Sequence, residues 1–240
     1  MQTYSIFTWN TQGDFTKDVK LQVINGLYPS GCVVGCIQEG GVEKHGTHGR
    51  WFAYAGPQIG SKNERCTNYI LVDATYSKFV DVSSLNISNG RGALVVGGGL
   101  AGRSPAAIAM NGILFISWHS LAGQSNTDTS LLIAAIESNN VYTNMFHTVV
   151  IGGDFNASPT DIRQLINRGT IRTKSFWKYN YRDVINSGNA THSSNKELDF
   201  FVILSKTQWI QKGILSNLKM IEMKAVVPSD HNPVRMQILI

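Results

Sequence analysis

The chain has 240 residues, of which 42% are hydrophobic and 15% charged, and this composition excludes an intrinsically disordered protein. Its 21 basic and 16 acidic residues give a net charge of +5, and the sequence pI near 9.1 favours an anionic partner such as nucleic acid, a phospholipid headgroup or a phosphorylated metabolite. No apolar run reaches the ~18 residues that a membrane helix needs, so we expect no membrane span.

Strand-like apolar runs alternate with helix-like segments along the whole chain, which predicts one α/β or α+β domain over residues 1–240. The helix expected at 16–27 has the apolar residues Val19, Val23 and Leu27 at intervals of four. In chain order, strands are expected at 4–9, 32–38, 68–72, 93–96, 105–110, 113–118, 148–151, 198–204 and 234–239, and further helices at 128–138 and 159–168.

Two of these boundaries carry strong local signals. Asn111-Gly112 tolerates the positive φ of a two-residue turn, so it predicts a hairpin between the fifth and sixth of the expected strands. Ser158 is followed by Pro159 and, three residues later, by Asp161, a pattern typical of a capped helix start.

The cysteines and the N-terminal residues indicate in which cellular compartments the protein could function. Cys32 and Cys36 lie in one apolar strand, where four residues span ~13 Å, so they cannot pair with each other. A bridge from Cys66 to one of them stays open, and the spacing does not resemble a zinc site. The N-terminal segment has neither the charged nor the apolar region of a signal peptide. The sequence is therefore compatible with a cytoplasmic protein and with a secreted one whose signal has been removed.

Polar residues stand where the expected apolar strands begin or end. Taken singly, such residues are usually turn formers, but the strand ends of one sheet lie on one rim, so these side chains are expected to converge. A rim rich in oxygen ligands suits Mg²⁺, Mn²⁺ or Ca²⁺ rather than zinc, and such cations commonly serve phosphate chemistry. The residues concerned are Asn10, Glu39, His119, Asp154, Asn156, Asp199, Asp230 and His231.

Several segments resemble, in the same order, the endonuclease/exonuclease/phosphatase superfamily, and within it the B subunit of the bacterial cytolethal distending toxins. The resemblance covers almost the whole chain. It implies the deoxyribonuclease I-like fold, a four-layer α/β sandwich of two packed mixed β-sheets flanked by helices. The segments that carry it are Thr-Trp-Asn-Thr-Gln-Gly at 8–13, Gln-Glu at 38–39, Trp-His-Ser-Leu-Ala at 118–122, Gly-Gly-Asp-Phe-Asn at 152–156, Thr-His at 191–192, Leu-Asp at 198–199 and Ser-Asp-His at 229–231.

The resemblance also implies roles for the residues at the rim. Glu39 matches the family's Mg²⁺ ligand, with Asp230 and Asn10 completing or supporting the site. His231, oriented by Asp199, matches the family's base. His119 matches the second histidine, which is placed near the scissile phosphate. Asp154 and Asn156 match the pair that orients water and contacts the phosphate. Which histidine is the base and which the acid is left open by the sequence.

Basic residues interleaved with aromatic ones between 163 and 182 are typical of a nucleic-acid contact. The alternative is a solvated helix face followed by core aromatics. From this segment we expect Lys174, Lys178 and Arg182 to bind the substrate backbone. Outside it, we expect Arg103 to bind a neighbouring phosphate through two nitrogens of its guanidinium.

The leading functional hypothesis is a Mg²⁺-dependent endonuclease that nicks DNA, acting as the active subunit of a secreted bacterial genotoxin. The resemblance then implies toxin delivery subunits as partners, export, and action in the host nucleus. One alternative is a phosphoinositide phosphatase on the same fold. Another is a catalytically silent binding module, which the full set of polar residues argues against.

Overall fold

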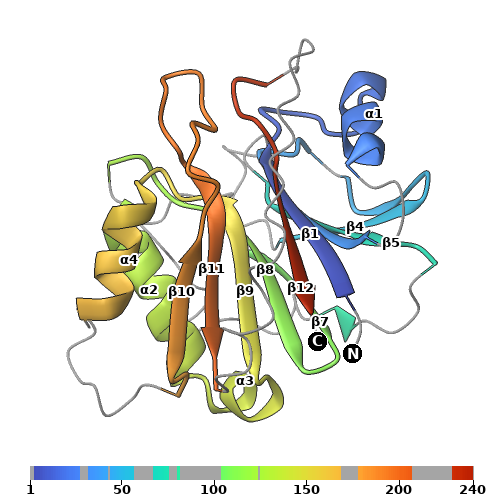
Figure 1. Cartoon of the computed structure of the whole chain (residues 1–240). Coiled ribbons are helices and arrows are strands. Elements are labelled where there is room, and N and C mark those ends of the chain that lie inside the picture. Colours follow the sequence, from blue (N-terminus) through green and yellow to red (C-terminus); the bar gives the residue numbers. More distant parts are fainter. Residues whose placement is uncertain are drawn as a thin grey trace.

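The computed structural model describes residues 3–27, 32–42, 44–56, 67–75, 80–81, 104–123, 125–168, 178–206 and 229–239. Within these ranges the chain forms two six-stranded sheets that pack face to face, with helices on both outer sides (Figure 1). Both sheets are mixed. The four-layer α/β sandwich expected from the sequence is therefore confirmed.

The first sheet packs against a single described helix, α1 (Asp18–Gly26), through a core that includes Ile24 of the helix together with Trp9 and Trp51 of the sheet. Only β1 and β2 run parallel; the other neighbours are antiparallel. In pairing order its strands are β12 (Val234–Leu239), β1 (Thr3–Asn10), β2 (Cys32–Gln38), β5 (Tyr69–Asp73), β4 (Trp51–Ala55) and β3 (Gly46–His48).

The second sheet is covered by α2 (Ser125–Ser138), α3 (Asn140–Met145) and α4 (Pro159–Arg168), which bury their apolar faces on it. Here β8 and β9 form the one parallel pair. In pairing order its strands are β10 (Tyr181–Ile185), β11 (Asp199–Ser205), β9 (Thr148–Asp154), β8 (Ile113–His119), β7 (Ala106–Met110) and β6 (Val80–Asp81).

Between the sheets lies a third core, to which Ile6 and Val34 contribute from the first sheet and Phe115, Val150 and Phe201 from the second. These side chains are fully buried. Burying a side chain of this kind stabilises the fold by roughly 1.5–3 kcal/mol. Because both sheets depend on this core, their ends are held in a fixed relation, and so are the residues that the strands carry to the rim.

The hairpin expected at Asn111-Gly112 is confirmed, with φ of +50° and +75° at the two residues. The capped helix start is confirmed as well. Ser158 Oγ accepts from the backbone N–H of Asp161 at 3.1 Å and donates to its carboxylate at 2.7 Å.

The apolar stripe expected on the first helix is wrong at one position. Val19 is 52% exposed, whereas Lys20 beside it is buried. The ammonium group of Lys20 donates to the backbone carbonyls of Thr11, Gln12 and Gly13. The helix thus faces the core through Val23, Ile24 and Leu27, and it uses a lysine to hold the loop that follows β1.

Five elements were not predicted: β3, β4, β6, α3 and β10. The strand β3 has only three residues, and α3 has six. The cap of α3 is a single residue, Asn139, whose side chain accepts from the N–H groups of Val141 and Tyr142. The strand expected at 93–96 lies outside the described residues, as does Cys66. Cys36 is a buried free cysteine.

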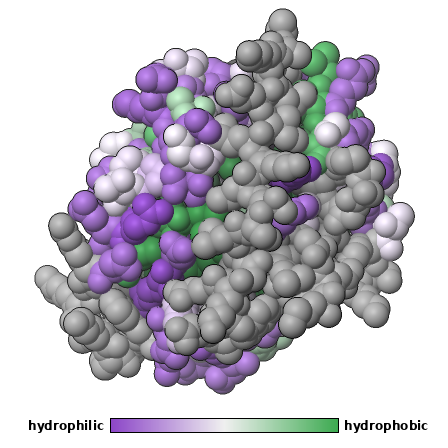
Figure 2. Space-filling view, viewed as in Figure 1, coloured by the Kyte–Doolittle hydropathy of each residue, from purple (hydrophilic) through white to green (hydrophobic). Residues whose placement is uncertain are grey.

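None of the described helices is long and apolar enough to cross a membrane. Figure 2 shows that the described residues on this face are largely hydrophilic, with small hydrophobic areas between them.

Candidate active site

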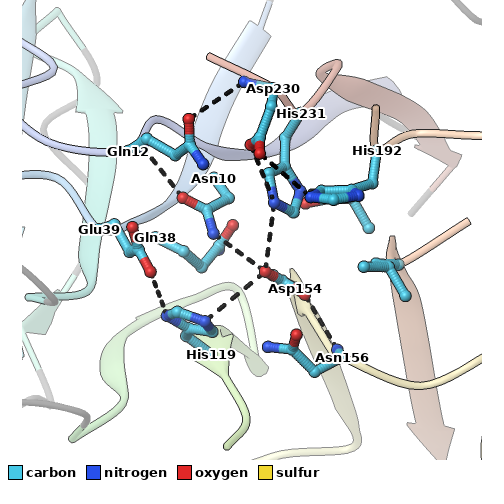
Figure 3. A network of polar contacts seen from close by, with 12 residues as sticks. Asn10, Gln12, Gln38, Glu39, His119, Asp154, Asn156, His192, Asp230 and His231 are labelled. Atoms are coloured by element: carbon cyan, nitrogen blue, oxygen red, sulfur yellow. Dashed lines mark hydrogen bonds and ion pairs between the residues drawn. The ribbon is translucent and has the colours of Figure 1, made fainter. Parts of the chain in front are cut away.

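The polar residues expected at one rim do converge there, because the topology brings the relevant strand ends together (Figure 3). In the first sheet Asn10 pairs with Gln38, so β1 and β2 end side by side. In the second sheet His119 pairs with Asp154, and Asp154 pairs with Asp199, the first residue of β11.

The segment before β12 joins the rim through direct contacts with the end of β1. The indole Nε1 of Trp9 donates to the carbonyl of His231 at 2.9 Å. Ser229 Oγ donates to the carbonyl of Asn10 at 2.7 Å and accepts from the backbone N–H of His231 at 3.1 Å. These bonds fix the imidazole of His231 over the boundary between the two sheets.

His231 and Asp199 form a buried dyad. The imidazole Nδ1 lies 2.8 Å from Asp199 Oδ2, and the two side chains are only 5% and 0% exposed. Thr191 Oγ1 accepts from the backbone N–H groups of Leu198 and Asp199, which fixes the start of β11. A carboxylate on Nδ1 holds the ring in the tautomer that presents Nε2 to the rim.

Asp154 lies at the centre of the cluster. Its Oδ2 accepts from Asn10 Nδ2 at 2.9 Å and lies 3.6 Å from His119 Nε2 and 3.7 Å from His231 Nε2. Gly153 before it permits this placement, since a Cβ at that position would lie 2.1 Å from the carbonyl oxygen of Trp118. One carboxylate therefore faces both histidines.

Glu39 reaches the rim from the end of β2 with a positive φ of +51°, an uncommon conformation for a residue with a side chain. Its carboxylate is 27% exposed and lies 3.8 Å from His119 Nδ1. The preceding Gln38 is fully buried and donates to Ser117 Oγ of the other sheet at 3.0 Å. Strained backbone that the surroundings hold in place is typical of functional sites.

Asn156 closes the other side of the cluster. Its backbone N–H donates to Asp154 Oδ1 at 2.9 Å, and its Nδ2 donates to the carbonyl of Ser120 at 2.9 Å. The loop after β9 is thus tied to the loop after β8, and the amide of Asn156 stays beside Asp154 (Figure 3).

Two residues that the sequence did not single out as site residues complete the rim. His192 Nε2 lies 3.2 Å from Asp230 Oδ2, and its ring packs edge-on against that of His231 at 4.6 Å. Gln12 Oε1 accepts from the backbone N–H of Asp230 at 3.2 Å. The available signal was their place in the two segments 8–13 and 191–192 that carry the resemblance.

The structure does not favour the substrate contact expected at Arg182. The Arg182 side chain is 5% exposed, and its guanidinium pairs with the buried carboxylate of Glu137 on α2. Lys178 is exposed but lies at the far end of the sheet. Tyr181 pairs with Ser205, and Ser205 with Thr148 at the start of β9, ~20 Å from Asp154 at ~3.3 Å per residue. This register places Lys178 far from a phosphate held at the rim. Arg103 and Lys174 lie outside the described residues.

Electrostatics at the rim favour a charged His231. Burial lowers the pKa of His231, but the hydrogen bond and charge of Asp199, together with the charges of Asp154 and Asp230, outweigh burial and raise the pKa to about 9. The ordinary histidine value is ~6.5. The proton is thus bound more tightly in the folded protein than in the unfolded chain.

This difference predicts a pH-dependent stability. The contribution of His231 is fully present below pH ~6.5 and is lost as the pH rises to about 9, amounting to about 3 kcal/mol at ~1.36 kcal/mol per pKa unit. Urea unfolding in EDTA at pH 6, 7.5 and 9 should therefore show that the free energy of unfolding falls more steeply with pH in the wild type than in His231→Gln. Parallel losses in both proteins would contradict the placement of this proton.

The cluster has the donor chemistry of a metal site. One imidazole nitrogen and the carboxylate oxygens of Asp154 and Asp199 lie within 4.8 Å of one another, and so do ligand atoms of His192, Asp230 and His231. The partly exposed carboxylate of Glu39 borders the same space. The carboxylate oxygens among these donors fit Mg²⁺, which usually takes one or two carboxylates and keeps several waters.

Comparison with solved structures places this geometry in a known fold. Over 97% of both chains, the structure is similar to cytolethal distending toxin from Actinobacillus actinomycetemcomitans, with a TM-score of 0.63 and 18% identity. The endonuclease domain of a telomere-specific non-LTR retrotransposon gives 0.62 and 14% over 99% of both chains. An endonuclease/exonuclease/phosphatase from Bacteroides vulgatus gives 0.62 and 12% over the full length of both chains.

No protein-family model matches the sequence, and no curated protein matches it either. At these identities the likeness concerns the backbone. The chain has the deoxyribonuclease I-like fold of the endonuclease/exonuclease/phosphatase superfamily.

Proposed function

We propose that the protein is a divalent-metal-dependent phosphodiesterase that nicks DNA. The observation that carries the proposal is the meeting of the His231–Asp199 dyad, Asp154 and His119 at one rim, where Asp154 Oδ2 lies 3.6–3.7 Å from both histidines. A base and an acid on either side of one carboxylate suit the attack of water on a phosphodiester and the protonation of the leaving oxygen.

Each residue has a defined task in this proposal. In the molecules whose His231 is neutral, a fraction that grows as the pH rises toward about 9, Nε2 accepts a proton from the attacking water, while Asp199 holds Nδ1–H and stabilises the imidazolium that forms. His119 protonates the leaving oxygen. Asp154 and Asn156 position the water and the phosphate. Glu39, supported by Asn10 and Asp230, would hold the metal. When bound, Mg²⁺ (or Mn²⁺ or Ca²⁺) neutralises charge on the phosphate oxygens.

Relaxation of supercoiled plasmid tests the proposal. We expect nicking by the wild type in Mg²⁺, no nicking in EDTA, and loss of nicking in His119→Ala. Circular dichroism of the variant controls for folding. A folded, Mg²⁺-binding wild type that leaves plasmid intact would overturn the DNA assignment, and phosphate release from inositol phospholipids would then identify the alternative substrate. A folded protein without Mg²⁺ affinity would favour the silent binding module.

Similarity to three cytolethal distending toxin structures, one of them of the biologically active subunit, supports a finer proposal. The chain would be the active subunit of a secreted genotoxin that depends on delivery subunits and acts in the host nucleus. Directed to the nuclei of cultured cells, it should cause DNA breaks that His119→Ala does not. Plasmid nicking without nuclear breaks would instead favour a cytoplasmic nuclease.

A further inference from the structure

Three side chains on the outer part of the rim converge apart from Glu39: His192, Asp230 and His231. Backbone bonds hold them together, since Ser193 N–H donates to the carbonyl of Asp230 at 2.8 Å and His192 and His231 form an isolated antiparallel bridge. The chain path therefore brings the three residues together, and their side chains carry the donor atoms.

The donor atoms of the three side chains lie within 4.8 Å of one another, close enough to share one small cation. His192 Nε2 lies 3.2 Å from Asp230 Oδ2, and His231 Nε2 lies 3.5 Å from Asp230 Oδ1. Tetrahedral Zn²⁺ with bonds of about 2.0–2.1 Å holds its donor atoms ~3.3–3.4 Å apart. Because these two distances end on different oxygens of Asp230, side-chain rotation is needed before all three residues can bind one ion.

The groups behind these donors also suit a metal. The other nitrogen of His231 is bonded to Asp199 at 2.8 Å, which is the carboxylate–histidine arrangement usual behind a metal ligand. Asp230 Oδ1 is a buried atom that has no hydrogen-bond partner among the described residues. A buried carboxylate oxygen in this state gains from a cation.

His192 can present a lone pair to the same point. Its Nδ1 accepts from the backbone N–H of Ser194 at 3.0 Å and lies 2.6 Å from Ser194 Oγ. Binding of an ion at Nε2 requires the ring proton to move to Nδ1, where the Ser194 hydroxyl can accept it in place of the bond from the Ser194 N–H. This change of tautomer by itself releases no proton from the site.

We infer that His192, Asp230 and His231 form a second metal site, which is selective for borderline transition-metal ions such as Zn²⁺ and shares Asp230 with the proposed hard-cation position at Glu39. Two imidazoles and one carboxylate are donors that Zn²⁺ prefers over Mg²⁺. Because the ion would occupy Nε2 of His231, it would block the proposed base, so Zn²⁺ would inhibit. The inhibition, unlike the binding, rests on the proposed function.

Binding is tested on the untagged full chain by competition with a chromophoric Zn²⁺ chelator, without DNA. We expect His192→Asn and Asp230→Asn each to weaken Zn²⁺ binding by at least the ~10–100-fold that loss of an outer-shell partner costs. His45→Asn, at an exposed histidine elsewhere, should bind like the wild type. Equal affinity in the wild type and in both folded site variants would overturn the inference.

A separate measurement addresses the inhibition. In excess Mg²⁺, Zn²⁺ at concentrations that fill the site should suppress plasmid nicking by the wild type. Unchanged nicking at full Zn²⁺ occupancy would overturn the inhibitory role. If the protein nicks nothing under any condition, the proposed function fails, while the chelator titration still decides whether the Zn²⁺ site exists.

Discussion

Replacing His231 with alanine is expected to lower kcat for plasmid nicking by ~10²–10⁴-fold, the usual contribution of a general base. The reason is geometric. His231 Nε2 faces Asp154 at 3.7 Å, and its other nitrogen lies 2.8 Å from Asp199, which is the shortest imidazole–carboxylate contact among the described residues at this rim. KM should change much less than kcat, because the base acts mainly in the transition state.

The Asp199→Asn variant tests whether Asp199 is needed for His231 to act as the base. It keeps the shape of the dyad but removes the charge, so the tautomer and basicity of His231 are both altered. We expect Asp199→Asn to lose most of the kcat that His231→Ala loses. The variant that carries both substitutions should have a kcat no lower than that of the more damaged single variant, since the effects of residues that act as a unit are not additive. His45→Ala is the matched histidine control. A His231→Ala variant that keeps more than a tenth of the wild-type kcat would contradict the assignment of the base.

Much of the site could be predicted because its residues obey a topological rule. Asn10, His119 and Asp154 each follow an apolar run that reads as a strand, and parallel neighbours in a sheet end at the same edge. The Asn111-Gly112 hairpin could also be predicted from the sequence, because its signal lies within two residues. Such local or strand-end signals can be recognised in the sequence without knowledge of the tertiary structure.

Other features depend on distant contacts that no local pattern reveals. Arg182 lies in a basic, aromatic segment, yet its partner is Glu137, 45 residues earlier in the chain. His192 lies in an irregular turn, and only the fold brings it against His231. Lys20 occupies a helix position where apolar periodicity predicts exposure, but three backbone carbonyls need a donor there. A buried polar group has a hydrogen-bonding or ionic partner, and that partner can be identified only in the folded structure.

The fold and the chemistry also constrain each other at the rim. Glu39 takes a left-handed backbone conformation, and Asn156 does so with φ of +47°. Asparagine tolerates this region well, whereas a glutamate there has a conformational cost. The inter-sheet bond from Gln38 to Ser117 and the β2–β1 pairing hold Glu39 in place. We therefore regard the strain at Glu39 as the consequence of aiming its carboxylate at the rim.

The largest expected effect on stability comes from the ion pair between Glu137 and Arg182. Their side chains are 2% and 5% exposed, so removing either partner leaves the other charge buried and unpaired. Burial raises the pKa of Glu137, and the charge of Arg182 and their hydrogen bond oppose that rise. Glu137→Leu and Arg182→Leu should each lower the free energy of unfolding by ~3–5 kcal/mol.

A double-mutant cycle separates this structural role from the substrate contact first expected of Arg182. The double variant should regain a large part of the loss, because two apolar side chains can replace a buried pair at little cost. Urea unfolding of the wild type, both single variants and the double variant gives the coupling energy. The double variant should also keep the wild-type KM for plasmid, since the pair connects β10 to α2 and lies away from the rim. A loss below 1 kcal/mol in both single variants, or a tenfold higher KM in a stable double variant, would show instead that Arg182 serves the substrate.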